Sequence, residues 1–203
     1  MLVALNPHQD DEYTSAHGIP MTEEAFGKLI QAESPYSYEL IGGIAYNMTG
    51  SSPKHSALSS RIDLLLSEQL GRRGPCHTHR DQYVAIPDRP PVVPDVVLTC
   101  DRADWNDDEY TKPFKIRSPL IVVEVLSLST EAYDRGEKFA RYQRCSTLEV
   151  YILVSQVARH IEVYRKNTGW RQEVFTGMQF IQLNQLDLEL SLEEIYEGIL
   201  KEV

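Results

Sequence analysis

The sequence contains neither of the two glycine-rich motifs that bind nucleotide phosphates, GxxxxGK[ST] and GxGxxG. Their absence argues against a protein that uses nucleoside triphosphates or dinucleotides. No apolar stretch approaches the roughly 20 residues of a membrane span. The first residues, Met1 to Leu5, are too short for the apolar core of a signal peptide and include no basic segment. We therefore expect no association with a membrane.

Cysteine is scarce. The three cysteines, Cys76, Cys100 and Cys145, are odd in number, widely spaced and without a CxxC pair. The simplest interpretation of such a set is three reduced thiols in the core. This interpretation predicts a cytoplasmic protein.

Basic residues are outnumbered, since 20 lysines and arginines face 30 aspartates and glutamates, a formal net charge of -10. The field of such a molecule repels phosphate at long range, which argues against a protein that coats nucleic acid non-specifically. It does not exclude a local basic cleft. The 203 residues and a hydrophobic content of 42% suit one globular domain. We expect a polar, flexible arm over residues 1–20 and a single domain over 21–203.

Capping residues and glycine turns predict the first part of this domain. Thr22 is expected to cap a helix, Gly42 and Gly43 to form a tight hairpin turn, and Ser52 before Pro53 to open a second helix. The predicted elements are a helix over 22–32, strands over 38–41 and 44–47, and a helix over 52–70.

Short apolar runs predict strands in the second part, over 82–86, 96–99, 120–126, 148–154, 159–165 and 170–175. Asp134 with Glu137 three residues later matches a capping box, which predicts a helix from Asp134 to about Arg144. Strand, helix and strand then make a parallel crossover unit. Ser191 is expected to cap a last helix. The expected fold class is therefore α/β, with a mixed central β-sheet flanked by helices.

Two further segments have polar sequences. The connection over 101–118 is long and charged, so we expect a functional loop or a small flap. His77 and His79 are expected in a loop over 74–80. No third ligand stands at a useful spacing from them, so they do not predict a metal site.

Glu124 is the residue with the strongest functional signal. It stands within the run Leu120 to Leu126, whose other members are aliphatic and which reads as a strand covered on both faces. A buried carboxylate is costly without a partner. Candidates are Asp95, which opens another apolar strand, and Lys138, on the predicted helix. Two acids on neighbouring strands with a lysine nearby are the components of a hard-metal site for phosphodiester hydrolysis.

Three arginines accompany Lys138 on or beside its helix, Arg135, Arg141 and Arg144. They could hold flanking phosphates, or they could form an ordinary solvated charged face.

These residues also carry a resemblance to a known family, the Uma-two family, which is described as restriction-endonuclease-like within the PD-(D/E)xK nuclease superfamily. The likeness extends from about Met21 to the C-terminal helix. The segments that carry it are Tyr38-Glu39-Leu40-Ile41-x-Gly43, Ser52-Pro53-x-His55, Pro94-Asp95-Val96, Val123-Glu124-Val125-Leu126-Ser127-x-Ser129-Thr130 and Tyr133-Asp134-Arg135-Gly136-Glu137-Lys138, followed by Tyr142.

The resemblance implies roles for four residues. Asp95 and Glu124 would bind the metal, Mg²⁺ or Mn²⁺, and Lys138 would be the catalytic lysine. In the wider superfamily that lysine stands two residues after the second acid, where this chain has Leu126, so Lys138 would have migrated to the helix. Glu39 would be an accessory acid; otherwise it is an exposed strand residue.

The predicted function is metal-dependent hydrolysis of nucleic-acid phosphodiester bonds, with DNA as the expected substrate and a homodimer as the expected assembly, because cutting both strands needs two sites. One alternative is a catalytically inactive nucleic-acid-binding or assembly protein that retains the fold, which the acidic balance favours. Another is a hydrolase of a different phosphoester. His55 is expected to be a cap or surface residue.

Overall fold

The computed structural model of the protein describes residues 18–32, 34–48, 51–71, 74–105 and 114–200. The chain divides into two compact units, Met1–Gly50 and Ser51–Val203, and each is considered on its own. Most of the expected arm, residues 1–17, lies outside the described residues. The last two residues of the expected arm, Ile19 and Pro20, form a short strand. A single domain over 21–203 stays a prediction.

The described residues of the first unit form a three-stranded sheet with one helix. Thr22 caps the helix as predicted, because its hydroxyl accepts a hydrogen bond from the amide of Ala25. The predicted hairpin is also present, and Gly42 and Gly43 have φ angles of 58° and 81°, which glycine adopts without a Cβ clash. The elements are β1 (Ile19–Pro20), α2 (Glu23–Gln31), β2 (Tyr38–Ile41) and β3 (Ile44–Asn47), with the strands in the order β1-β3-β2.

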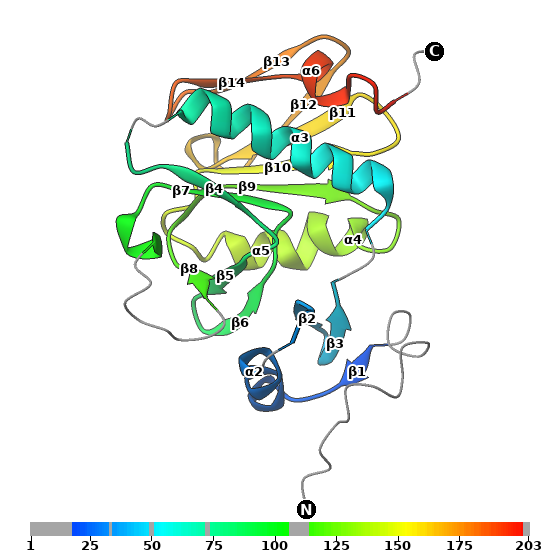
Figure 1. Ribbon diagram of the computed structural model, residues 1–203, viewed down its shortest axis with the longest axis vertical. Helices are drawn as coiled ribbons and strands as arrows, with labels where there is room; N and C mark the ends of the chain where they lie inside the picture. Colours follow the sequence, from blue (N-terminus) through cyan, green and yellow to red (C-terminus); the bar gives the residue numbers. More distant parts are fainter. Residues whose placement is uncertain (1–17, 33, 49–50, 72–73, 106–113, 201–203) are drawn as a thin grey trace, which may run out of the picture. The chain divides into compact units, whose positions relative to one another are not determined.

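A six-stranded mixed sheet lies at the centre of the second unit (Figure 1). Its parallel pair consists of the two strands that flank the predicted crossover helix, and its other neighbouring pairs are antiparallel. The predicted mixed sheet and the predicted C-terminal hairpin are therefore confirmed. In spatial order the strands are β12 (Gln172–Thr176), β11 (His160–Arg165), β10 (Val150–Ser155), β9 (Pro119–Leu126), β7 (Val96–Thr99) and β4 (His77–Arg80).

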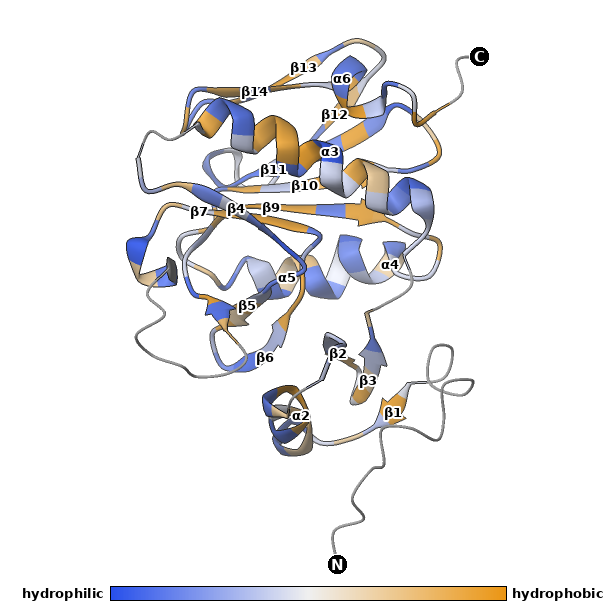
Figure 2. Ribbon diagram, viewed as in Figure 1, coloured by the Kyte–Doolittle hydropathy of each residue, from blue (hydrophilic) through white to orange (hydrophobic). Residues whose placement is uncertain are grey.

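One face of this sheet is covered by α3 (Pro53–Leu70), α6 (Leu192–Tyr196) and a hairpin of β13 (Phe180–Leu183) and β14 (Leu188–Ser191), as Figure 1 shows. Hydrophobic residues fill the space between the layers, and Figure 2 shows β9 as hydrophobic over most of its length.

The first covering helix, α3, follows its sequence signals. The hydroxyl of Ser52 accepts from the amide of His55, and Pro53 takes the first helical position. Leu58, Ile62 and Leu66 form an apolar stripe along the helix and are fully buried, while Leu65 and Leu70 are partly buried against the same core.

The opposite face is covered by one helix in three parts and by a small sheet (Figure 1). The helix consists of α4 (Glu131–Tyr133), a π-helical segment η2 (Asp134–Lys138) and α5 (Phe139–Tyr142). The small sheet has the order β6-β5-β8, with β5 (Tyr83–Ile86), β6 (Arg89–Val92) and β8 (Lys115–Ile116). Two 3₁₀ turns, η1 (Arg102–Trp105) and η3 (Lys166–Thr168), complete the described elements.

The predicted start of the crossover helix is wrong. Asp134 lies inside the helix, since its amide already donates to the carbonyl of Thr130 at 2.9 Å. The helix begins one turn before the capping box, because the hydroxyl of Ser127 accepts from the amide of Thr130. The carboxylate of Asp134 accepts from the hydroxyl of Thr130 instead. Lys138 is therefore two turns into the helix.

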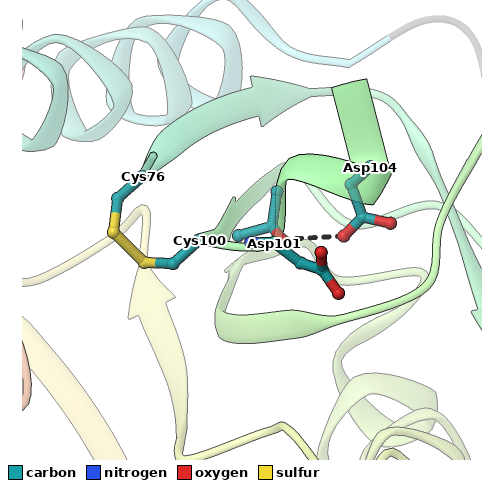
Figure 3. Close-up of a disulfide and its surroundings, with 5 residues drawn as sticks. Cys76, Cys100, Asp101 and Asp104 are labelled. Atoms are coloured by element: carbon teal, nitrogen blue, oxygen red, sulfur yellow. Dashed lines mark hydrogen bonds between the residues drawn. A yellow bond between two sulfur atoms is a disulfide. The ribbon is translucent and has the colours of Figure 1, made fainter. Parts of the chain in front are cut away.

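The prediction of three free thiols is wrong for two of them, because Cys76 and Cys100 form a disulfide (Figure 3). Cys76 directly precedes β4 and Cys100 directly follows β7, and the pairing of His77 with Thr99 brings their ends together. Cys145 is free and buried, as predicted. The prediction of a cytoplasmic protein rested on three reduced thiols, and only one of them is present.

The segment predicted to be a loop over 74–80 also differs, because its second half is the edge strand β4. His77 and His79 lie on this strand. Its sequence, His-Thr-His-Arg, contains no hydrophobic residue that would have predicted a strand.

Asp104 anchors the two ends of the long connection that follows β7, and Figure 3 shows Asp101 and Asp104 at its start. Its buried carboxylate accepts from the hydroxyl of Thr99 at 2.7 Å and from the amides of Arg117 and Ser118 at 2.7 and 3.1 Å. The middle of the predicted flap, residues 106–113, lies outside the described residues. None of the helices among the described residues combines the length and the hydrophobicity of a membrane-spanning segment.

Candidate functional site

Glu124 is the only charged residue of β9, and it is 3% exposed. Residues on a strand alternate between its faces. Val123 and Val125 accordingly pack in the core beneath α3, whereas Val122 and Leu126 pack on the opposite face. Glu124 shares that opposite face and points toward the helix of α4, η2 and α5.

Three acceptors surround the ammonium group of Lys138, which is 2% exposed. Its Nζ lies 2.9 Å from Glu124 Oε1, 3.0 Å from the carbonyl oxygen of Val93 and 3.8 Å from Asp134 Oδ1. Tyr142, one turn further along the helix, donates its hydroxyl to the same oxygen of Glu124 at 2.9 Å. The structure thus places the predicted lysine on the predicted glutamate, in surroundings that strengthen charge interactions.

Asp95 lies immediately before β7, beside the C-terminal end of β9. The antiparallel register pairs Val96 with Val123, and one further residue along this register sets Asp95 opposite Glu124. Asp95 Oδ2 accepts from the amide of Val125 at 2.6 Å. The carboxylate therefore replaces a ladder hydrogen bond of the sheet, which gives Asp95 a structural role besides its predicted one.

His55 is a candidate site residue that the sequence analysis undervalued. Its Nε2 lies 3.3 Å from Asp95 Oδ2, and its side chain is 15% exposed. Burial lowers the pKa of His55, but the hydrogen bond to Asp95 and the charges of Asp95 and Asp81 raise it, and the net shift is upward. The available signal was its place in the Ser52-Pro53-x-His55 segment, three residues after the helix cap.

Asp81 is a second acid near Asp95 that the sequence analysis missed. Burial raises the pKa of its carboxyl, Arg80 lowers it, and the negative charge of Asp95 raises it again, so that the net shift is upward. Asp81 follows β4 directly and has a φ of 53°, in the left-handed region that aspartate tolerates. Only the pairing of β4 with β7 brings it toward Asp95, and the polar sequence of β4 did not predict that pairing.

Glu39 lies on β2 opposite Tyr46, and it is buried rather than exposed. Because Glu39 belongs to the first unit, its proximity to Asp95 and Glu124 stays a prediction.

The three arginines of the crossover helix each pair with acids of the chain. Arg135 contacts Glu131 and the buried Glu162 of β11, Arg141 contacts Glu137, and Arg144 contacts Asp88. These pairs favour the interpretation of a charged structural face over that of phosphate ligands.

Asp95 and Glu124 are the two carboxylates that could hold the predicted metal. Within the described ranges, no three His, Cys, Asp or Glu side chains gather closely enough to hold an ion. Mg²⁺ is commonly bound through one or two carboxylates, while substrate phosphates and waters complete its shell. Both described contacts of Asp95 fall on Oδ2. A pair of hard oxygen donors, with Asp95 engaged through one oxygen, fits Mg²⁺ or Mn²⁺.

A mixed sheet with helices on both faces is the arrangement of a restriction-endonuclease-like domain. The sequence pattern of the Uma2 family, described as "Putative restriction endonuclease", matches residues 23–198. The chain belongs to the Uma2 family, which is the Uma-two family that its motifs resemble.

The chain is also similar to two relatives and to one solved structure. The chain is 34% identical to "Uncharacterized protein slr1290" of Synechocystis sp. over 80% of its own length and 84% of that protein. It is 27% identical to "Uncharacterized protein sll1609" of the same organism, over 69% and 77%. Its fold is similar to that of a protein from Anabaena variabilis described as "a putative nuclease belonging to DUF820", with a TM-score of 0.71, 17% identity, and coverage of 87% and 98%.

Proposed function

We propose that this protein is a metal-dependent nuclease that hydrolyses phosphodiester bonds of nucleic acid, with Mg²⁺ or Mn²⁺ as its cofactor. One observation carries the proposal. Lys138 lies 2.9 Å from Glu124, and Asp95 is hydrogen-bonded to the residue that follows Glu124. Three residues from separate elements, whose side chains suit metal-dependent hydrolysis, therefore lie close together where β9 ends and β7 begins.

Asp95 and Glu124 would hold the ion, and Glu39 would support them from the hairpin. A bound divalent ion would supply a Lewis acid for the phosphate oxygens. The protein's own contribution is to fix the two carboxylates, Glu124 through Lys138 and Tyr142 and Asp95 through the amide of Val125.

Lys138 would stabilise negative charge that develops on the scissile phosphate, or would orient the attacking water. Its ammonium is held by an acid and a backbone carbonyl, so its position is set before substrate arrives. Such preorganisation makes an electrostatic group effective, because no reorganisation is needed during the reaction.

DNA as the substrate, action as a homodimer and a cytoplasmic location belong to the same proposal. A dimer supplies the two sites that cutting both strands needs, and the cytoplasm gives access to nucleic acid.

The first test is a calorimetric titration with Mn²⁺ of the wild-type protein, Asp95→Asn and Glu124→Gln. We expect binding to the wild type and its loss in both variants. A matched control is Lys54→Ala, which removes an exposed charge near the site and should bind as the wild type does. Wild-type binding that both acid variants retain would contradict the assignment of these ligands.

The second test measures hydrolysis of DNA, RNA and a small phosphodiester such as bis-p-nitrophenyl phosphate. Lys138→Met should lose on the order of 10²- to 10³-fold in rate, the usual cost of removing one preorganised charge-stabilising group. Circular dichroism and thermal unfolding would show that the variant folds. Turnover of the small substrate without cleavage of nucleic acid would favour a different phosphoesterase.

A non-catalytic nucleic-acid-binding or assembly protein is the second candidate. The observation that favours it is the pairing of Arg135, Arg141 and Arg144 with acids, together with the net charge of -10. The two candidates differ in the Lys138→Met experiment. Hydrolysis that disappears in the folded variant excludes the non-catalytic candidate.

A further inference from the structure

His55 reaches Asp95 from an element that carries no other predicted site residue. It lies in the first turn of α3, and the cap from Ser52 fixes its backbone at 3.1 Å. α3 packs on the face of the sheet opposite the helix that carries Lys138. Asp95 is thus approached from one face by His55, while Lys138 holds Glu124 on the other.

Both described contacts on Asp95 fall on the same carboxylate oxygen. The amide of Val125 donates to Oδ2 at 2.6 Å, and Nε2 of His55 lies 3.3 Å from Oδ2. Two partners on one oxygen fix the direction of the carboxylate plane more strongly than one does. Oδ1 is left as the oxygen that neither partner engages.

We propose that His55 is a positioning residue for the metal site: it donates Nε2–H to Asp95 Oδ2 and so presents Oδ1 to the divalent ion. The inference rests on the proposed function, because it assumes that Asp95 is a ligand. Carboxylates that bind metals are generally held by such hydrogen bonds, and removal of the partner typically costs 10- to 100-fold in metal affinity.

The affinity for Mn²⁺ alone tests this role. His55→Leu should bind Mn²⁺ about 10- to 100-fold more weakly than the wild type. His55→Gln should recover most of that loss, since its amide nitrogen can take the place of Nε2 as a donor. Lys54→Ala, beside His55 on the exposed surface of α3, should keep wild-type affinity. Wild-type affinity in His55→Leu, or equal losses in the Leu and Gln variants, would overturn the proposal.

A spectroscopic signal separates positioning from direct ligation. Electron spin echo envelope modulation of the Mn²⁺ complex detects a nitrogen bound to the ion. If His55 only positions Asp95, the spectrum of the wild type should contain no imidazole coupling from His55. An imidazole coupling that is present in the wild type and absent in His55→Leu would make His55 a ligand and overturn the positioning role. Thermal unfolding without metal checks that the His55 variants fold. If His55→Gln binds Mn²⁺ more tightly than His55→Leu does, the weak binding of the Leu variant cannot be explained by a folding defect that both variants share.

The outcomes also separate this inference from the proposed function. If Asp95→Asn loses Mn²⁺ and His55→Leu binds as the wild type does, the metal site stands and only the role of His55 fails. If the wild type binds no Mn²⁺, both the metal site and the positioning role fail.

Discussion

A buried ammonium group is stable only where acceptors replace its lost water, and Lys138 has them. Glu124 and the carbonyl of Val93 lie within hydrogen-bonding distance, and Asp134 is 3.8 Å away. The pair of Lys138 and Glu124 is therefore at once a candidate catalytic arrangement and part of the core.

This double role predicts an unequal response to two variants. Lys138→Met leaves the carboxylate of Glu124 buried without its cation, and we expect a loss of about 3–5 kcal/mol in the free energy of unfolding. The double variant Lys138→Met/Glu124→Gln removes both charges and should lose less. Urea denaturation measures both. A double variant that is no more stable than the single one would contradict the explanation by an isolated buried charge.

Glu162 predicts a pH dependence of stability. Burial raises its pKa, but the hydrogen bonds from Arg135 and Tyr164 and the charge of Arg135 lower it, and the net shift is downward from 4.5. A carboxyl with a lowered folded-state pKa stabilises the protein above its unfolded pKa, and the contribution is lost as pH falls through the folded value. His160 and Glu131 also face this cluster.

The measurement compares the wild type with Glu162→Gln by urea unfolding from about pH 6 to about pH 3. The wild type should be the more stable protein near pH 6, and the difference should shrink as the pH falls. The comparison cancels the titration of the other acids. A difference that stays constant across this range would contradict the assignment.

At the scale of single residues, the sequence predicted those site residues whose type is unusual for their surroundings. Glu124 was selected because an acid in an aliphatic strand needs a partner, and Lys138 proved to be that partner. His55 and Asp81 had ordinary surroundings in the sequence. Their proximity to Asp95 depends on α3 and β4 lying beside β7, which no local pattern encodes.

At the scale of elements, β4 shows where pattern reasoning stops. The strand is polar and lies at the edge of the sheet, so it lacks the hydrophobic alternation by which strands are found. The disulfide between Cys76 and Cys100 depends on that strand, and it was missed for the same reason. The helix α3 was found because a cap, a proline and an apolar stripe agree.

The disulfide predicts a countable result. The oxidised protein, denatured without reductant, should show one thiol that reacts with Ellman's reagent, that of Cys145, and three after reduction. Reduction should also lower the free energy of unfolding by about 2–4 kcal/mol, because the bond restricts the unfolded chain. Cys76→Ser/Cys100→Ser should match the reduced protein and no longer respond to reductant. Three reactive thiols before reduction would contradict the pairing.

The crossover helix was predicted in the right place but with the wrong start. Its π-helical segment ends at Lys138, and such segments occur often at functional sites. The capping-box pattern at Asp134 and Glu137 is present in the sequence, but the turn in which the hydroxyl of Ser127 accepts from the amide of Thr130 begins the helix earlier. Two local patterns each indicate a helix start here, and the sequence alone does not show which of the two starts the helix.

At the scale of the whole molecule, the net charge of -10 opposes the approach of nucleic acid. We therefore expect a divalent ion to strengthen binding of a labelled oligonucleotide on the order of tenfold or more, because the ion offsets repulsion between the acids and the phosphates. Fluorescence anisotropy in EDTA and in Ca²⁺ measures this effect without requiring cleavage.

Glu124→Gln provides the control for that measurement. Its affinity should depend less on the divalent ion, and it should bind somewhat more tightly in EDTA because one negative charge is gone. Equal affinity in EDTA and in Ca²⁺ for the wild type would contradict an ion-mediated contact.

The mixed sheet and its flanking helices could be predicted because apolar runs and caps alternate along the chain. The strand order β12-β11-β10-β9-β7-β4 could not, since it depends on how separate segments pair.

The hydrogen bond between Asp95 and the amide of Val125 has an evolutionary consequence. A carboxylate that completes the sheet would be retained by selection for folding even after turnover was lost. Among descendants of this domain, Asp95 would then outlast the activity, and its retention would be a poor marker of a working enzyme. Substitution of a residue that serves the ion alone would be the earlier trace of decay.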